Sequence, residues 1–94
     1  MKRTVKVNIA ETIFYLDEDA YDLLNRYLHK VGNYFGDTPE GKEIIADIES
    51  RIAELFQDKI NAMKQVIVIE DVHHVIETMG QPEEFGDKIS YTTA

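Results

Sequence analysis

The longest regular pattern of apolar residues in this chain lies between Pro39 and Met63. Apolar residues recur there at steps of three and four, which places them on one side of a helix with 3.6 residues per turn. They are Ile44, Ile45, Ile48, Ile52, Leu55, Phe56, Ile60 and Met63. Because the opposite side carries mostly charged residues, the pattern predicts an amphipathic helix around which the core is built.

Two segments before this helix have the pattern of strands. Polar and apolar residues alternate from Thr4 to Ile9, which is typical of a strand with one face on the core. From Thr12 to Leu16 the chain is almost continuously apolar, so this second strand is expected to be buried on both faces. Ala10 and Glu11 would form the turn, although neither tolerates positive φ as Asn-Gly or Gly-Gly does.

A second amphipathic helix is predicted from Asp17, as the N-cap, to about Phe35, with Gly36 ending it. Its apolar residues are Ala20, Leu23, Leu24, Tyr27, Leu28, Val31, Tyr34 and Phe35. Gly32 inside it disfavours the helix by about 1 kcal/mol relative to Ala. This glycine indicates either a close approach of a neighbouring backbone or a helix that frays beyond Val31.

The short loop before Pro39 joins the two helices. Thr38 and Pro39 are a good N-cap and first residue for the second of them. A loop this short predicts an antiparallel helical hairpin whose facing sides form most of the core.

The remaining residues predict one more strand and one more helix. Val66 to Ile69 are β-branched and predict a buried strand that joins the first two. Glu70 and Asp71 open a short helix with Val72, Val75, Ile76 and Met79 on its inner face, Gly80 ends it, and Phe85 is expected to close the edge of the core. The fold class is therefore α+β, in the order ββααβα: a helical hairpin on a two- to three-stranded sheet, with a short C-terminal helix. Residues 1–86 form one domain, and residues 87–94 are expected to be a flexible tail or the start of a linker.

Composition narrows the function classes. Asp and Glu outnumber Lys and Arg by 18 to 10, so the net charge of −8 disfavours nucleic-acid binding unless the cations gather on one face. The absence of cysteine fits a reducing compartment, and the cytoplasm is expected. No apolar segment is long enough for a signal peptide or a membrane span, so any membrane attachment would come from a segment outside this chain.

Three groups of residues are candidates for chemistry. Glu70, His74 and Glu77 share one side of the last helix, next to His73, and could hold a metal ion, but an exposed polar face is the favoured interpretation. Glu49 and Glu54, with Arg51 between them, lie opposite the core stripe rather than in a cleft. Neither Ser50 nor Ser90 has the setting of a nucleophile. The sequence therefore predicts no catalytic residue, no metal site and no cofactor.

The tyrosines and the longest helix are two candidates for nucleic-acid binding. Stacking platforms are interleaved with Lys and Arg, whereas Asp17, Asp19 and Asp22 lie among these tyrosines, which favours the core edge or a patch for a protein partner. The tyrosines are Tyr15, Tyr21, Tyr27, Tyr34 and Tyr91. A helix-turn-helix would need residues 40–63 as its recognition helix, and the exposed side of that helix is mainly acidic.

Three segments resemble one known family. They are DEDAYDLLNRYL at Asp17–Leu28, DIESRIAELF at Asp47–Phe56 and IEDVHHVIETMGQPEEF at Ile69–Phe85. They are similar to the N-terminal region of phage-shock-protein-C (PspC) domain membrane proteins of the kind found in Bacteroidetes. Where that family tends to have Gly-Gly in the first turn, this chain has Ala10-Glu11, and where Thr often precedes Ile-Glu-Asp it has Val68.

The resemblance implies a cytoplasmic domain followed by transmembrane helices and linked to envelope-stress signalling, in proteins often labelled as transcriptional regulators. We therefore expect a non-enzymatic regulatory domain that acts through protein partners, with a homodimer as one form. The alternatives are a DNA-binding domain of a stress-responsive regulator, and a small enzyme or metal-dependent module that uses Glu70, His74 and Glu77.

Overall fold

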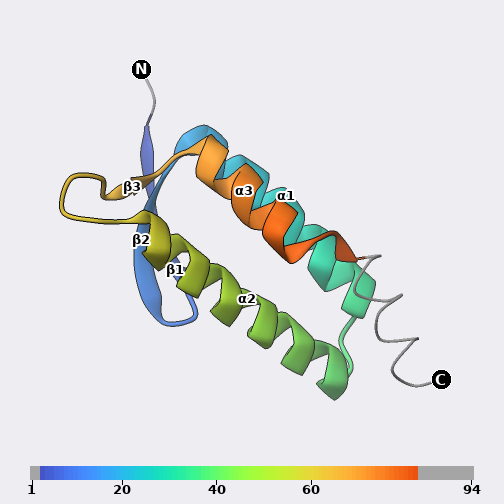
Figure 1. The fold of residues 1–94 in the computed structure, drawn as a ribbon. Coiled ribbons are helices and arrows are strands. Elements are labelled where there is room, and N and C mark those ends of the chain that lie inside the picture. Colours follow the sequence, from blue (N-terminus) through green and yellow to red (C-terminus); the bar gives the residue numbers. More distant parts are fainter. Residues whose placement is uncertain (1–2, 83–94) are drawn as a thin grey trace.

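The computed structural model describes residues 3–82, which form three helices and one small sheet (Figure 1). The elements are β1 (Thr4–Ile9), β2 (Thr12–Asp17), α1 (Glu18–Phe35), α2 (Pro39–Lys59), β3 (Val66–Ile67) and α3 (Ile69–Met79). The α+β class and the order ββααβα are confirmed. Phe85 and the boundary near residue 86 lie outside the described residues.

The sheet has the strand order β1-β2-β3. β1 and β2 are antiparallel, with pairs running from Thr4 and Asp17 to Ile9 and Thr12. β3 is parallel to β2 and pairs through Tyr15–Val66 and Leu16–Ile67. The third strand therefore joins the hairpin as predicted, but it is only two residues long because Val68 already serves as the N-cap of α3.

The turn between β1 and β2 uses residues that are unfavourable for it. Ala10 and Glu11 have φ angles of 50° and 67°. Two-residue hairpins of type I′ require positive φ at both central positions, which disfavours residues with a Cβ. The hairpin forms nevertheless, because the paired strands hold the turn in this conformation.

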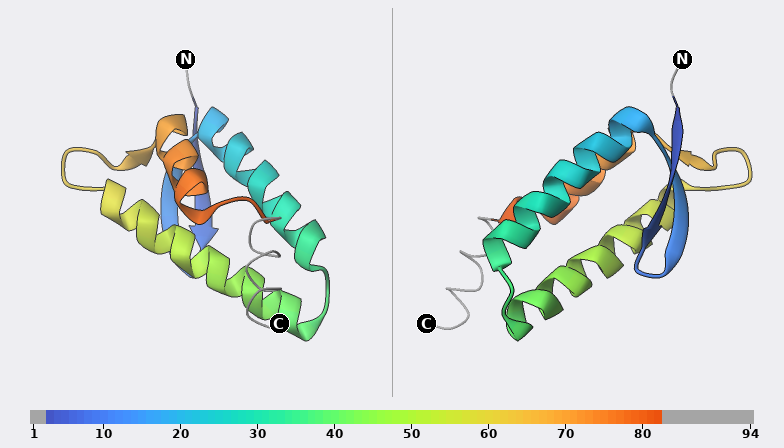
Figure 2. Two further views of the ribbon diagram at one scale, coloured as in Figure 1. Left: turned by 45° about the vertical axis from the view of Figure 1, so that its right-hand side comes forward. Right: turned by 180° about the vertical axis from the view of Figure 1, so that it is seen from behind.

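All three helices converge on the sheet at one end and extend away from it (Figures 1 and 2). α1 and α2 are antiparallel, as predicted, and α3 lies beside α1 and also contacts α2. α1 and α3 both leave the sheet end and run in the same direction. The core contains the buried residues Ile9, Phe14, Leu16, Ala20, Leu24, Tyr27, Val31, Ile48, Ile52, Ala53, Phe56, Ile67, Val72 and Val75.

The end of α2 differs from the prediction. The helix ends at Lys59 rather than Met63, and Asn61 organises the loop that follows. The Asn61 Oδ1 atom accepts hydrogen bonds from the backbone N–H groups of Met63 at 2.8 Å and Lys64 at 3.0 Å. Because an Asn side chain that bonds the backbone in this way competes with helical hydrogen bonds, the helix stops early. Met63 is 96% exposed, so its assignment to the core stripe was wrong.

Burial of β2 is also different from the prediction. Phe14 and Leu16 are buried, but Ile13 and Tyr15 on the opposite face are each 46% exposed. The helices cover only one face of the sheet, so the expectation of burial on both faces was wrong. Tyr34, assigned to the buried side of α1, is likewise 48% exposed.

Neither explanation offered for Gly32 holds. α1 continues past it to Phe35, and a Cβ at Gly32 would have no atom within 4 Å. The close approach occurs instead at Gly41 in the first turn of α2, where a Cβ would lie 2.4 Å from the carbonyl oxygen of Phe35. Gly41 is therefore the glycine that lets α2 pack against the end of α1.

Candidate functional site

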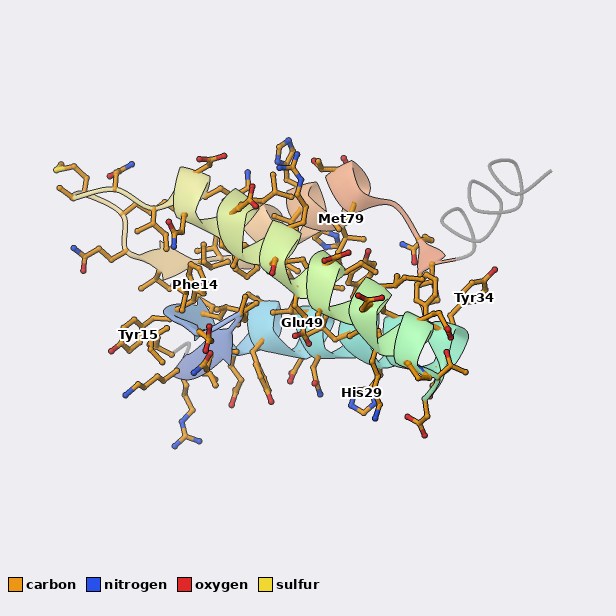
Figure 3. The ribbon with its side chains drawn as sticks, turned by 90° about the horizontal axis from the view of Figure 1, so that it is seen from below. Phe14, Tyr15, His29, Tyr34, Glu49 and Met79 are labelled. Carbon is orange, nitrogen blue, oxygen red and sulfur yellow. The ribbon has the colours of Figure 1, made fainter. Side chains whose placement is uncertain are left out.

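The uncovered face of the sheet carries an apolar patch. Cross-strand pairing places Lys6 opposite Tyr15 and Asn8 opposite Ile13, and β3 adds Val66 beside Tyr15. We call Lys6, Ile13, Tyr15 and Val66 the outer-face patch. In Figure 3 Tyr15 points away from the helices, whereas Phe14 lies on the helical side, where its ring meets that of Phe56 at a centroid distance of 5.5 Å. Phe14 and Tyr15, which are neighbours in one strand, thus face opposite sides of the sheet.

The edge of β1 borders this patch. β1 is one of the two edge strands, and among residues 3–82 no strand pairs with its other side. The N–H of Glu18 donates to the carbonyl of Arg3 at 2.7 Å, and bonded positions alternate along an antiparallel pair. The backbone groups of Thr4, Lys6 and Asn8 therefore face the open edge, where they can pair with another strand.

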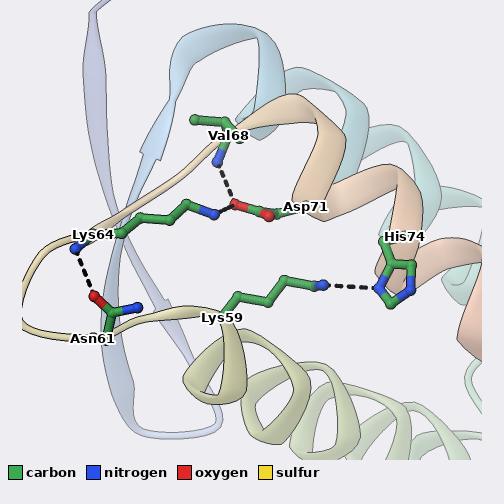
Figure 4. Close-up of polar contacts among 6 residues, drawn as sticks. All are labelled: Lys59, Asn61, Lys64, Val68, Asp71 and His74. Atoms are coloured by element: carbon green, nitrogen blue, oxygen red, sulfur yellow. Dashed lines mark hydrogen bonds and ion pairs between the residues drawn. The ribbon is translucent and has the colours of Figure 1, made fainter.

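A polar cluster joins α2 to the start of α3 (Figure 4). Asp71 binds the ammonium of Lys64 and accepts a hydrogen bond from the Val68 N–H at 3.1 Å. Since Val68 has no side-chain acceptor, only this half of a capping box is formed. Partial burial works to raise the pKa of Asp71, but hydrogen bonds from Lys64 and the Val68 N–H, with the charges of Lys64 and Lys59, outweigh it and lower the pKa.

The histidine face of α3 does not have the arrangement of a metal site. His74 accepts a hydrogen bond at Nδ1 from the ammonium of Lys59, 2.8 Å away, because an ammonium can only donate. His73, Glu70 and Glu77 are exposed. Within residues 3–82 no three His, Asp or Glu side chains are gathered closely enough to hold an ion. The Lys59 charge beside His74 would also repel a cation.

The carboxylates of α2 lie on its solvent side. Arg51 and Glu54 form the expected ion pair at 3.3 Å, with side chains that are 56% and 68% exposed. Ser50 is exposed on the same helix, and Glu49 is half-buried. The structure brings none of these four residues into a described pocket. Ser90 lies outside the described residues.

The described tyrosines have different environments. Tyr27 is buried and donates its hydroxyl hydrogen to the carbonyl of Gly80 at 2.8 Å, which ties α1 to the end of α3. Tyr21 is half-buried at the core edge. Tyr15 and Tyr34 are exposed, and the Tyr34 ring meets that of Phe35 edge-on at 5.2 Å. Core edge and exposed patch both occur, and Tyr91 lies outside the described residues.

One pocket was missed by the sequence analysis. It lies between α1 and α3 and has a volume of about 260 Å³. Its lining residues are Leu23, Arg26, Tyr27, Lys30, His73, Ile76 and Gln81. The four residues from α1 are spaced by three and four, so they form one side of that helix. This spacing was the available signal, but it indicates a pocket only once α3 is known to lie alongside.

Comparison with known proteins found no match: no family model, no curated protein and no solved structure matches this chain. No helix within residues 3–82 has the length and apolar character needed to cross a membrane.

Proposed function

We propose that this domain is a non-enzymatic regulatory module that binds a protein partner through the outer-face patch and the adjoining edge of β1. The observation that carries the proposal is the exposure of Ile13 and Tyr15, each 46%, on the face of the sheet opposite the buried Phe14 and Leu16. Tyrosine is enriched at protein interfaces because its ring supplies a large contact area and its hydroxyl a hydrogen bond.

The open edge of β1 suggests how a partner would bind. A partner segment that pairs with Thr4, Lys6 and Asn8 would extend the sheet, and its side chains on that face would lie beside Lys6, which already faces Tyr15. An acidic side chain there would pair with the Lys6 ammonium. Pairing specificity would thus come from the patch, and affinity from the backbone hydrogen bonds.

A second copy of this chain fits the edge less well than a different protein. The symmetric antiparallel pairing that uses most of β1 is centred on Lys6, which would place two ammonium groups opposite each other. Like charges in directly opposed positions destabilise a sheet. We therefore place a homodimer second, and sedimentation of the protein at high concentration tests it.

The setting that we propose is the cytoplasmic part of a PspC-like envelope-stress membrane protein. This part of the proposal is supported by the resemblance of Asp17–Leu28, Asp47–Phe56 and Ile69–Phe85 to that family. The DNA-binding alternative is disfavoured by the exposed Glu43, Asp47, Glu54 and Asp58 on α2. A specific, salt-resistant electrophoretic shift with promoter DNA would favour it over our proposal.

Site-specific photo-crosslinking tests the interaction. A photoreactive phenylalanine analogue at Tyr15, in the full-length protein in its own cells, should capture one predominant partner. The same analogue at Ser50, exposed on α2, serves as the control. Capture at Tyr15 should be lost when Ile13 is replaced by Asp, with the thermal transition of the isolated domain unchanged. Equal products from both positions, or capture that survives Ile13→Asp, would contradict the proposal.

A further inference from the structure

The pocket between α1 and α3 concentrates positive charge on an acidic protein. The chain has 10 Lys and Arg residues against 18 Asp and Glu, yet both Arg26 and Lys30 line this one pocket, beside the donor-capable ring of His73. We propose that it binds a compact organic oxyanion, a carboxylate or phosphate group carried on an apolar body. This site is separate from the outer-face patch, since the two share no residue.

Arg26 is available to a ligand. Its side chain is exposed, and no hydrogen bond or ion pair to another of the described residues holds it. Three acidic residues lie one turn away on the two helices: Asp22 before Arg26, Glu70 before His73 and Glu77 after His73. None of them forms an ion pair within residues 3–82. A guanidinium presents two parallel N–H groups, which match the two oxygens of a carboxylate or phosphate.

Lys30 is the second cation that lines the pocket. Its ammonium donates to the Oε1 atom of Gln81 at 3.0 Å, which directs it across the gap between α1 and the residues after α3. An ammonium has three donors, so this bond leaves two for a ligand. Gln81 thus positions a second cation facing the same space as Arg26.

The apolar lining restricts the rest of the ligand. Leu23, Tyr27 and Ile76 provide the hydrophobic part of the wall. The Tyr27 hydroxyl is already bonded to the Gly80 carbonyl, so its ring offers mainly an apolar surface. A volume of about 260 Å³ accommodates roughly ten non-hydrogen atoms at the density of a liquid. An inorganic anion would leave this wall unused, and a ligand without a charge would leave the cations unpaired.

Titration followed by NMR on the whole chain tests the site. The probes are phenyl phosphate and phenylacetate, with inorganic phosphate and 2-phenylethanol as matched partial ligands, all at one ionic strength. The methyl signals of Leu23 and Ile76 should shift and saturate with at least one of the first two probes, with a dissociation constant of about 1 mM or below, which suits a ligand of this size. The probe that binds more tightly identifies the oxyanion.

Matched variants assign the binding to the pocket. Arg26→Gln should weaken the interaction roughly tenfold because a charge-assisted hydrogen bond is lost, and Arg26→Lys should weaken it less because the charge remains. Arg51→Gln, which removes the same charge from the exposed side of α2, should leave the affinity unchanged. The proposal is overturned if neither charged probe saturates, if 2-phenylethanol or inorganic phosphate binds as tightly, or if Arg51→Gln weakens binding as much as Arg26→Gln.

Discussion

At the end of the molecule far from the sheet, α1 passes into α2 through residues suited to the task by their own chemistry. Gly36 adopts a φ of 74° and its N–H donates to the Gly32 carbonyl at 2.9 Å. The Thr38 hydroxyl accepts the N–H of Gly41 at 3.0 Å, and Pro39 occupies the first turn of α2. Each of these residues has a high preference for the position it takes.

At the sheet end the connections lack such residues. Ala10 and Glu11 form a turn that favours Gly or Asn, and Val68 is an N-cap without a capping oxygen. These positions are held by residues outside the turn and the cap: the paired strands β1 and β2, and Asp71, which binds both Val68 and Lys64. The helical end is thus specified by the residues of the connection itself, and the sheet end by strand pairing and by the side chain of Asp71.

The largest effect is expected from Phe14→Ala at the sheet end. Phe14 is 2% exposed and packs on Phe56, so its truncation should lower the free energy of unfolding by about 3–5 kcal/mol, measured by urea denaturation. Ile13→Ala, one residue away on the outer face, is the control and should lower it by less than about 1 kcal/mol. Equal losses would mean that the outer face is also buried, and the patch would not exist.

Gly41→Ala tests the helical end. The added Cβ would meet the Phe35 carbonyl oxygen at 2.4 Å, so the variant should lose about 1–3 kcal/mol of stability in the same assay. Gly32→Ala places the same methyl group in open space within α1 and should gain up to about 1 kcal/mol. A gain from both substitutions would show that the two helices are not in close contact there.

Asp71→Asn tests whether the sheet end depends on the bonds of Asp71 to Lys64 and to the Val68 N–H. The variant should be about 1 kcal/mol less stable than wild type at pH 7, since it loses the Lys64 ion pair and weakens the bond to Val68.

The pH dependence of this difference follows from the lowered pKa of Asp71. The folded state binds the proton less readily than the unfolded chain, so the stabilisation is complete above the ordinary aspartate pKa and is lost as the pH falls through the lowered pKa. Wild type and Asp71→Asn should therefore converge in acid. Glu54→Gln, which removes an exposed carboxylate, should change stability by only a few tenths of a kcal/mol. A stability difference between wild type and Asp71→Asn that persists unchanged in acid would rule out a contribution from the charge of Asp71.

A gain in stability is expected at the first turn. Replacing Ala10 by Asn and Glu11 by Gly relieves two left-handed conformations and should add about 1 kcal/mol. Thermal unfolding with Asn8→Gly as the comparison, in the extended strand, should show the opposite sign. A loss from the double variant would mean that Ala10 and Glu11 make contacts that offset their strain.

The difference between the helical end and the sheet end explains how much of the fold the sequence could predict. Gly36, Thr38-Pro39 and Gly80 carry local signals, so the helix ends that they mark were placed nearly to the residue. The end of α2 was misplaced because apolar periodicity continues through Met63, whereas the Asn61 loop ends the helix. Burial of β2 depends on how many layers cover the sheet, which its own residues do not show.

The candidate sites likewise depend on neighbours that the local sequence does not show. Glu70, His74 and Glu77 were grouped correctly on one helix, but the Lys59 ammonium that faces His74 comes from α2. The Arg26 pocket requires α3 beside α1, and the outer-face patch requires a face without helices. In each case the deciding neighbour lies far away in the sequence.

The parallel pairing of β2 with β3 bears on how the chain folds. Tyr15 and Val66 are partners, yet the whole helical hairpin lies between them in the sequence. The parallel pairing cannot form until that hairpin has folded back on itself. The entropic cost of closing this long loop therefore falls late in folding. We expect β3 to dock in the last stage, after a native-like helical pair has formed. Completion of the sheet, and with it of the outer-face patch, would then report that the entire chain has reached its native topology.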